Sequence, residues 1–197
     1  GLEMSRFDSE NCFQFMAMAA SYEQENIFQQ MKKIYGSRFL WHGSPTVRWH
    51  SIIRQGLKNL SYTDLMGCGA ACGEGIYFAT DSRISLDYAR PSDNPYPNSC
   101  LGKSFHIIAL CEVINLPIGQ EVTFEAEISK DDPNDDQGEK IKKVVKGVLN
   151  DHGECLTLTM NEACIVRFIL VGLTGSHNVQ TNPPENIPTL IQVLKFR

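Results

Sequence analysis

The residues of this 197-residue sequence that could do chemistry carry hydroxyl, imidazole and aromatic groups at fixed separations. In chain order they are His42, Gly43, Tyr77, Ser85 and Tyr88. The serine comes eight positions and the second tyrosine eleven positions after Tyr77. An imidazole and a hydroxyl each donate and accept hydrogen bonds, and tyrosine rings offer flat surfaces for stacking. These residue types indicate hydrogen bonding and ring stacking rather than metal ligation.

Two other chemistries that need a fixed residue pattern are not indicated. Cys68 and Cys72 lie four residues apart, but no second pair of cysteines or histidines follows at a ligand spacing, which argues against structural zinc. The run Gly73-Glu74-Gly75 precedes a strand-like stretch, whereas the phosphate loops of P-loop and Rossmann folds follow a strand and open a helix. The sequence therefore predicts no metal site and neither of these nucleotide folds.

Helical patterns occur in three places. Between residues 9 and 35 there is no Pro or Gly, and apolar residues recur at helical intervals. Ser21 with Gln24 forms a capping box, so we expect two short helices in this stretch, the second ending at Gly36. The other two helices are expected to be capped by Ser44, with Pro45 at the first helical position, and by Asp81 or Ser82.

Strand-like stretches separate these helices. They cover residues 38–42, 76–80, 105–114, 155–159 and 164–171. The segment from Ser129 to Gly153 begins with a turn-forming acidic run and continues with lysines, and we expect an exposed, mobile excursion there with a solvated surface. Strands separated by short helices and long loops predict an α+β domain built on a mostly antiparallel sheet.

Composition limits the class of protein. The length fits one globular domain with at most a short appendage, and the opening Gly1 suggests part of a longer chain. A net charge of −5 argues against strong non-specific binding to nucleic acid, which needs a basic face. The longest apolar stretch, residues 163–173, is too short to span a bilayer. Seven cysteines without a framework spacing favour reduced thiols and an intracellular location, cytoplasmic or nuclear.

The ordered motifs resemble the catalytic domain of the poly(ADP-ribose) polymerase family, the diphtheria-toxin-like ADP-ribosyltransferases. The resemblance extends from about residue 37 to residue 173, and its elements are His42-Gly43-Ser44, the Gly-x-Gly-Ile-Tyr-Phe run of residues 73–78, Ser85-x-x-Tyr88 and the strand of residues 108–113. It implies the ADP-ribosyltransferase fold, with two packed, mostly antiparallel sheets, short helices and an NAD cleft. We therefore expect an N-terminal helical segment over residues 1–36 and a catalytic domain over residues 37–197.

The resemblance also implies roles for the matched residues, with NAD as the substrate and no metal. The nicotinamide ring would stack on Tyr77 and Tyr88. Its carboxamide would bind the backbone of Gly43, which lacks a Cβ, and the hydroxyl of Ser85. His42 would bind a ribose hydroxyl. His42 and Tyr77 are also the first two members of the family's His-Tyr-Glu triad.

The third triad position decides between two activities. Matching residues 167–170 to the family's basic-aromatic-aliphatic-aliphatic pattern and counting back puts this position on Cys155, directly after Glu154. Because adjacent side chains on a strand point to opposite faces, a register error of one residue would place the glutamate there instead. A neutral thiol cannot stabilise an oxocarbenium-like transition state as a carboxylate does. Cys155 in this position resembles the mono-ADP-ribosylating branch of the family.

The expected activity is therefore mono-ADP-ribosyl transfer from NAD to protein side chains, with release of nicotinamide; the chain itself is one candidate acceptor. Two alternatives stay open. One is a catalytically silent module that binds NAD or ADP-ribose or acts as a scaffold, and the other is a poly(ADP-ribose) polymerase that uses Glu154. The sequence indicates neither the acceptor residue nor the oligomeric state.

Overall fold

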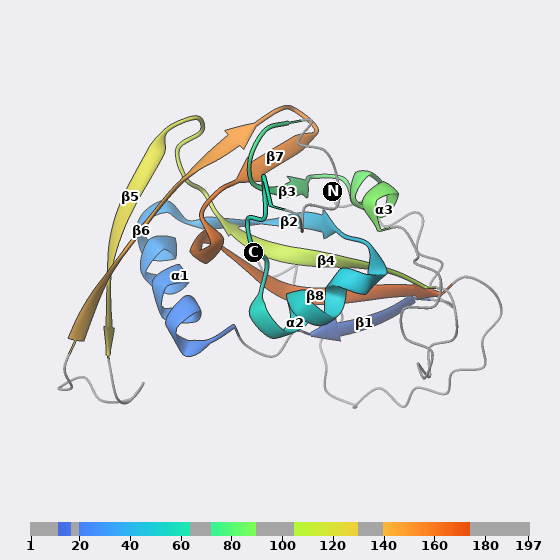
Figure 1. Ribbon diagram of the computed structural model, residues 1–197, viewed down its shortest axis with the longest axis horizontal. Helices are drawn as coiled ribbons and strands as arrows, with labels where there is room; N and C mark the ends of the chain where they lie inside the picture. Colours follow the sequence, from blue (N-terminus) through green and yellow to red (C-terminus); the bar gives the residue numbers. More distant parts are fainter. Residues whose placement is uncertain (1–11, 17–19, 64–71, 90–104, 130–139, 174–197) are drawn as a thin grey trace.

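The computed structural model describes residues 12–16, 20–63, 72–89, 105–129 and 140–173 (Figure 1). Eight strands in this part of the chain form an antiparallel sheet in the order β1-β8-β4-β2-β3-β7-β6-β5. Their bounds are β1 Cys12–Met16, β2 Ser37–Gly43, β3 Ile76–Ala79, β4 Phe105–Ile114, β5 Glu121–Ser129, β6 Lys140–Asp151, β7 Cys155–Leu158 and β8 Cys164–Leu173. The α+β class with an antiparallel sheet is confirmed. The hydrogen bonds link all strands in one order, so two separate packed sheets are not confirmed.

The helices pack against this sheet. They are α1 Tyr22–Tyr35, α2 Trp49–Gln55 and α3 Ser82–Tyr88, with 3-10 turns η1 Thr46–Arg48 and η2 Asn161–Ala163. As predicted, Ser21 caps α1 by accepting a hydrogen bond from the amide of Gln24 (3.2 Å), and the helix ends at Gly36. Asp81 caps α3 in the same way through the amide of Arg83 (2.8 Å). No helix in the described part of the chain has the length and apolar character needed to cross a membrane.

The prediction of two helices before residue 36 is wrong for the first of them, because a strand lies there. β1 pairs with β8 from Cys12 opposite Gly172 to Met16 opposite Phe168. Over so short a run, apolar spacing fits a helix and a strand equally well. The open edge of β8 decides the outcome by offering unpaired backbone groups to this segment.

The prediction of an exposed, mobile excursion between Ser129 and Gly153 is also wrong for most of this segment. β6 occupies residues 140–151 and pairs with β5, from Ser129 opposite Lys140 to Glu121 opposite Val148. Along β6, Val145 and Leu149 are buried while the lysines of the strand lie at the surface. This two-residue period is a strand pattern, which the high charge of the segment obscured.

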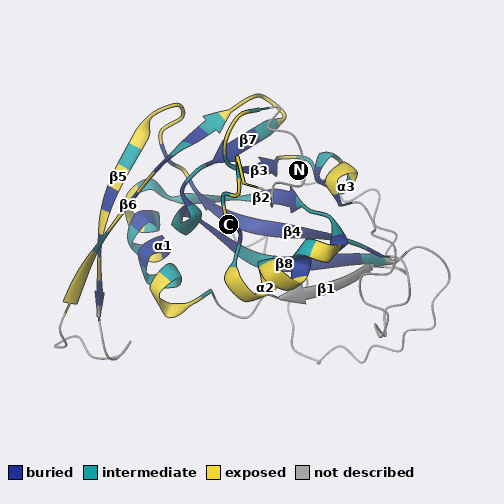
Figure 2. Cartoon of the chain, in the orientation of Figure 1, coloured by how far each residue is buried: buried dark blue, intermediate teal, exposed yellow. Residues whose placement is uncertain are grey.

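Both faces of the central strands are buried, which fixes the end of β2 in place (Figure 2). On one face, Ile27, Phe28 and Met31 of α1 join the main core. The other face carries a smaller cluster: Trp41, Ala89, Ile108, Leu110, Phe168 and Leu170. β4 contributes to both clusters, which explains its continuous apolar sequence.

Candidate active site

A cavity of about 360 Å³ opens between the end of β2, η1 with α2, the strand β3, the helix α3 and the start of β7. All six residues that the sequence assigned to a site line it: His42, Gly43, Tyr77, Ser85, Tyr88 and Cys155. They come from four separate elements, β2, β3, α3 and β7, which the sheet order and the packing of α3 bring together. Their roles stay predictions, but their common location is a property of the fold.

His42 is held in one tautomer. Its side chain is buried, and its Nδ1 lies 2.8 Å from the backbone carbonyl of Tyr77. Because a carbonyl only accepts, Nδ1 carries the proton and donates it. Burial lowers the pKa of His42, and the bond to Tyr77 opposes this only in part. Nε2 of the neutral ring is therefore an acceptor, and it accepts a hydrogen bond from the hydroxyl of Ser44, whose oxygen lies 3.0 Å away.

Ser44 has a different role from the one expected. The turn η1 begins at Thr46 after Pro45, with no side-chain cap. The Ser44 hydroxyl instead binds His42, and the Ser44 carbonyl accepts a hydrogen bond from the indole of Trp49 (3.0 Å). The prediction that Ser44 caps a helix is wrong, because the proline displaced the helix start and the hydroxyl had a nearer partner in the imidazole.

Gly43 is required by a close approach of two backbone segments. A Cβ at this position would lie 1.8 Å from the carbonyl oxygen of Ser85, so no side chain fits between β2 and α3. Ser85 is itself buried. Gly43 and Ser85, the two residues predicted to bind a carboxamide, are thus in direct backbone contact.

The two tyrosines differ in their surroundings. Tyr88 is 45% exposed at the end of α3, whereas Tyr77 is partly buried in β3. The Tyr77 hydroxyl donates to the carbonyl of Gly73 (2.6 Å) and accepts from the amide of Cys72 (3.1 Å). Burial raises the pKa of this hydroxyl, and the neighbouring Cys155 and Tyr88 add smaller effects. Tyr77 thus anchors the turn before β3.

Cys155, and not Glu154, is the residue of its pair that lines the cavity. It is the first residue of β7 and lies opposite Ala79 of β3, while Glu154 is exposed before the strand begins. Burial and a side-chain hydrogen bond with Cys72 raise the pKa of Cys155 to about 12. The thiol is therefore neutral near pH 7.

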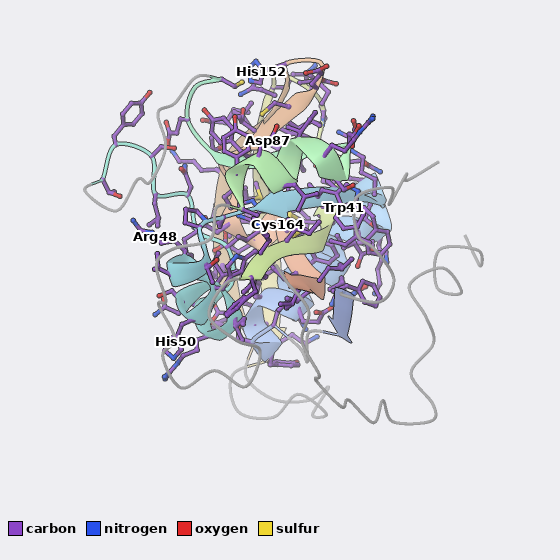
Figure 3. The ribbon with its side chains drawn as sticks, turned by 90° about the vertical axis from the view of Figure 1, so that its right-hand side faces the viewer. Trp41, Arg48, His50, Asp87, His152 and Cys164 are labelled. Atoms are coloured by element: carbon purple, nitrogen blue, oxygen red, sulfur yellow. The ribbon has the colours of Figure 1, made fainter. Side chains whose placement is uncertain are left out.

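Sequence reasoning missed two cationic residues that line the cavity. Arg48 and Lys58 both line it, from η1 and from the segment after α2. In Figure 3, Arg48 is labelled at the left edge of the molecule above His50 of α2, and Asp87 of α3 is labelled nearer the top. Two cations in the lining of one cavity suit a ligand with phosphate groups. Neither residue belongs to a motif found in the sequence, and a single Arg or Lys is an ordinary surface residue type, so no signal in the sequence distinguished them.

Within the described residues, no three His, Cys, Asp or Glu side chains gather where they could hold a metal ion. Cys68, the neighbour of Cys72 in the sequence, lies outside these residues.

Comparison with known proteins places the chain in a family. The sequence profile of the poly(ADP-ribose) polymerase catalytic domain matches residues 6–158. Mouse "Protein mono-ADP-ribosyltransferase PARP8" is 33% identical over 129 residues, which is 53% of this chain and 15% of that protein. Mouse "Protein mono-ADP-ribosyltransferase PARP16" is 36% identical over 80 residues, 40% of this chain and 23% of that protein.

A plant relative carries the other activity in its name. "Poly [ADP-ribose] polymerase 2" of Arabidopsis thaliana is 33% identical over 86 residues, which is 44% of this chain and 12% of that protein. The chain therefore spans less than a quarter of the length of each of these relatives. The profile match nevertheless includes every residue from β1 to β7, and the resemblance first seen in the His-Gly and Gly-x-Gly-Ile-Tyr-Phe motifs is confirmed: this chain belongs to the poly(ADP-ribose) polymerase catalytic domain family.

Proposed function

We propose that this domain transfers single ADP-ribose units from NAD to side chains of acceptor proteins and releases nicotinamide. The observation that carries the proposal is that a neutral thiol, Cys155, shares the cavity with His42 and Tyr77, while Glu154 is exposed. The names of the two mouse relatives, both mono-ADP-ribosyltransferases, agree with it. The acceptors, among them the chain itself, are part of the proposal.

NAD would lie with its nicotinamide against Tyr77 and Tyr88, because stacked rings hold a flat heterocycle. The backbone of Gly43 and the hydroxyl of Ser85 would bind the carboxamide. His42 would accept a ribose hydroxyl at Nε2, the atom that Ser44 now occupies.

The two cationic residues of the cavity suit the diphosphate of the substrate. The diphosphate of NAD would extend toward Arg48 and Lys58, whose charges complement the two phosphates.

The chemistry explains why the residue at position 155 matters. The bond between the ribose anomeric carbon and the nicotinamide nitrogen breaks, and its electron pair leaves with nicotinamide as a neutral product. Positive charge then develops on the ribose ring and needs a nearby negative charge. Because the Cys155 thiol is neutral, we propose that the carboxylate of the acceptor supplies this charge and then forms the new bond. A growing chain offers a hydroxyl instead, which without a glutamate to activate it would not react.

Two finer structural points belong with this proposal. These are the description of the fold as two packed sheets, and the division into an N-terminal segment over residues 1–36 and a catalytic domain over residues 37–197. Ile27, Phe28 and Met31 of α1 belong to the main core. We therefore propose that the two parts follow one another in the sequence but fold as one unit.

The test is the intact mass of the chain after incubation with NAD, with nicotinamide release followed in the same sample. We expect discrete single additions that disappear in the Tyr77→Ala variant and persist in Tyr22→Ala, a tyrosine of α1 outside the cavity. A ladder of units on one peptide would instead favour the polymerase that uses Glu154. NAD binding without addition or nicotinamide release would favour the silent module.

A second variant tests the role of residue 155 itself. Cys155→Glu restores the family carboxylate, and we expect it to extend single units into short chains. If this variant still adds one unit per site, Cys155 does not limit chain growth.

A further inference from the structure

The turn between β6 and β7 carries a side chain to which the proposed reaction gives no role. His152 is exposed and directly precedes the two turn residues Gly153 and Glu154. Its amide donates a hydrogen bond to the carbonyl of Cys155 (2.8 Å), which closes the turn. In Figure 3, His152 is labelled at the top of the molecule, above Asp87 of α3. The turn therefore joins an exposed histidine to the residue predicted for the third triad position.

The strand register fixes the side of the sheet on which this imidazole lies. β6 and β7 pair with Asp151 opposite Leu156, so His152 and Cys155 are the next pair of residues. Side chains directly opposite each other on paired strands share one face of the sheet. Because Leu156 belongs to the main core, Cys155 and His152 both face away from that core.

His152 ends a row of side chains that crosses three strands. β3 and β7 pair with Ala79 opposite Cys155, and the row continues from Cys155 to His152. Ala79 and Cys155 line the cavity, whereas His152 lies outside the lining as the exposed end of the row. A protein that approaches Cys155 from solvent along this row meets His152 first.

A hydrogen bond holds the imidazole in one orientation and one tautomer. Nε2 of His152 lies 3.2 Å from the hydroxyl oxygen of Thr157, its diagonal neighbour on β7. Thr157 is completely buried, and Nε2 is the one hydrogen-bond partner of its hydroxyl in the described part of the chain. A buried hydroxyl left without an acceptor is costly, so the hydroxyl donates and Nε2 accepts. The proton of the neutral ring is therefore on Nδ1.

This Nδ1–H group is available to a ligand. Among the described residues it has no hydrogen-bond partner. The neighbouring carboxylate of Asp151 accepts from the amide of Gly153 instead (2.8 Å). An N–H donor fixed in direction and exposed to solvent suits a group that only accepts, and an ionised carboxylate is such a group.

We propose that His152 is an acceptor-binding residue, whose Nδ1–H donates a hydrogen bond to the carboxylate that an acceptor protein presents beside Cys155. The assignment rests on the proposed function and adds a residue of this chain to it. One carboxylate oxygen accepts the hydrogen bond from His152, and the other forms the bond to the ribose anomeric carbon. The bond to nicotinamide breaks at the same carbon and its electron pair leaves with nicotinamide, so no proton is transferred.

The same contact discriminates among acceptors. A hydrogen bond to an ionised carboxylate is stronger than one to a neutral amide, so glutamate binds better than glutamine. A protonated lysine has three donors and no acceptor, so it gains nothing from the N–H group of His152. The exposed end of the row therefore favours acidic acceptor side chains.

Peptide kinetics test the assignment. The probe is a synthetic peptide with one glutamate, and its single additions at saturating NAD give kcat and KM. We expect His152→Leu, which removes the donor, to raise the peptide KM about tenfold with kcat little changed, the effect of one hydrogen bond to a charged group. His152→Asn places an amide N–H close to the position of Nδ1 and should restore most of the affinity. His50→Ala, at an exposed histidine of α2 outside the lining, should behave like the wild type.

A purely structural role in the turn would give a different pattern. If His152 only held the turn beside Cys155, its loss would also disturb the cavity. The affinity for carba-NAD, an NAD analogue that cannot lose nicotinamide, reports this, and we expect it to be the same in His152→Leu and the wild type. Weakened carba-NAD binding, an unchanged peptide KM, or equal effects of His152→Leu and His152→Asn would each overturn the proposal.

Binding alone separates this inference from the proposed function. The glutamate peptide is titrated into protein saturated with carba-NAD, beside a twin peptide with glutamine. We expect the glutamate peptide to bind about tenfold more tightly to the wild type than to His152→Leu, and the twin to bind both proteins equally weakly. If this pattern holds but NAD yields no addition, the proposed function fails and the contact with His152 stands. If peptide affinity does not depend on His152, the inference fails whatever the activity.

Discussion

The cavity around His42 and the contact between α1 and the sheet both bury ionisable groups, with opposite results. In the cavity, burial lowers the pKa of His42 and raises the pKa of Cys155 to about 12, so both groups are neutral. Beneath α1, the side chain of Glu112 is 4% exposed, yet its pKa is lowered to about 2. Depth of burial therefore does not decide the charge.

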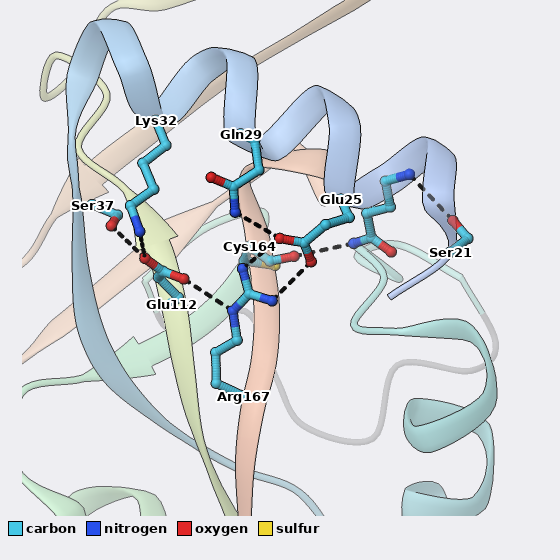
Figure 4. Close-up of polar contacts among 9 residues, drawn as sticks. Ser21, Glu25, Gln29, Lys32, Ser37, Glu112, Cys164 and Arg167 are labelled. Carbon is cyan, nitrogen blue, oxygen red and sulfur yellow. Dashed lines mark hydrogen bonds and ion pairs between the residues drawn. The ribbon is translucent and has the colours of Figure 1, made fainter. Parts of the chain in front are cut away.

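Partners decide it. Figure 4 shows the α1 charge cluster, which consists of Glu25, Lys32, Glu112 and Arg167. Arg167 binds Glu25 through two parallel hydrogen bonds (2.8 and 2.9 Å) and reaches Glu112 with its third nitrogen (2.9 Å). Lys32 and the Ser37 hydroxyl each lie 2.6 Å from the remaining Glu112 oxygen. These hydrogen bonds and the charge of Arg167 outweigh the cost of burial for Glu112.

The buried groups of the cavity, His42 and Cys155, have no charged partner among the described residues. His42 binds a carbonyl and a hydroxyl, and the Cys155 thiol donates a hydrogen bond to the Leu156 carbonyl (3.8 Å). The charge cluster holds α1 on the sheet, whereas His42 and Cys155 stay neutral in the lining of the cavity. The two regions thus use burial for different purposes, anchoring in one and binding in the other.

Removing the central cation should break the anchoring region most severely. Arg167→Met removes the guanidinium group that lies over the Phe28 ring, and it leaves Glu25 and Glu112 without their shared partner. We expect a loss of about 3 kcal/mol in the free energy of unfolding, because the buried Glu112 carboxylate loses one of its two cationic partners and Glu25 loses its bidentate one. Urea unfolding measures it, with Arg83→Gln as the control for an exposed ion pair, expected to cost under about 1 kcal/mol. A cost for Arg167→Met no larger than that of the control would show that the cluster does not anchor α1.

The cavity should instead be sensitive to size at one position. Gly43→Ala adds a Cβ that would lie 1.8 Å from the Ser85 carbonyl oxygen, and the glycine backbone is not in the left-handed region, so contact alone sets the cost. We expect a destabilisation of about 2 kcal/mol from overpacking, together with loss of carba-NAD binding. Ser85→Ala leaves the backbone contact intact and should unfold near the wild-type urea midpoint. Equal midpoints for all three proteins would mean that α3 moves away freely and that the close approach does not hold the cavity.

The same contrast explains which parts were predictable from the sequence. The strands that carry His42, Tyr77 and Cys155 are marked by local apolar runs and by motifs, so their positions could be predicted without coordinates. β1 could not, because its identity depends on the edge of β8, more than 150 residues away. The α1 charge cluster also went unrecognised. Its four members are ordinary surface residue types whose meeting depends on strand pairing and helix docking, and no local spacing reports that.

Acid should weaken the anchoring region in a defined range. The pKa of Glu112 is lowered from 4.5 to about 2, so the stability it contributes is present above pH 4.5 and is lost as the pH falls toward 2. Between pH 5.5 and pH 3 we expect Glu112 to account for a loss of about 1.5 kcal/mol. Urea midpoints across this range should fall less steeply for Glu112→Gln than for the wild type. Parallel curves would show that the carboxyl is not held by its partners.

The smallest effect distinguishes the two regions most cleanly, because it occurs at a pH where the carboxylates do not titrate. The pKa of His42 is lowered by burial, so the unfolded chain takes up a proton near pH 6.5 that the folded chain refuses. Stability should therefore fall as the pH drops from 7.5 to 5.5, by about 1 kcal/mol more in the wild type than in His42→Asn. The difference between the two urea series isolates His42 from the other histidines. A folded state that instead gained stability over this range would place a negative charge beside His42, and His42 would no longer be a neutral counterpart of the ionised residues in the α1 charge cluster.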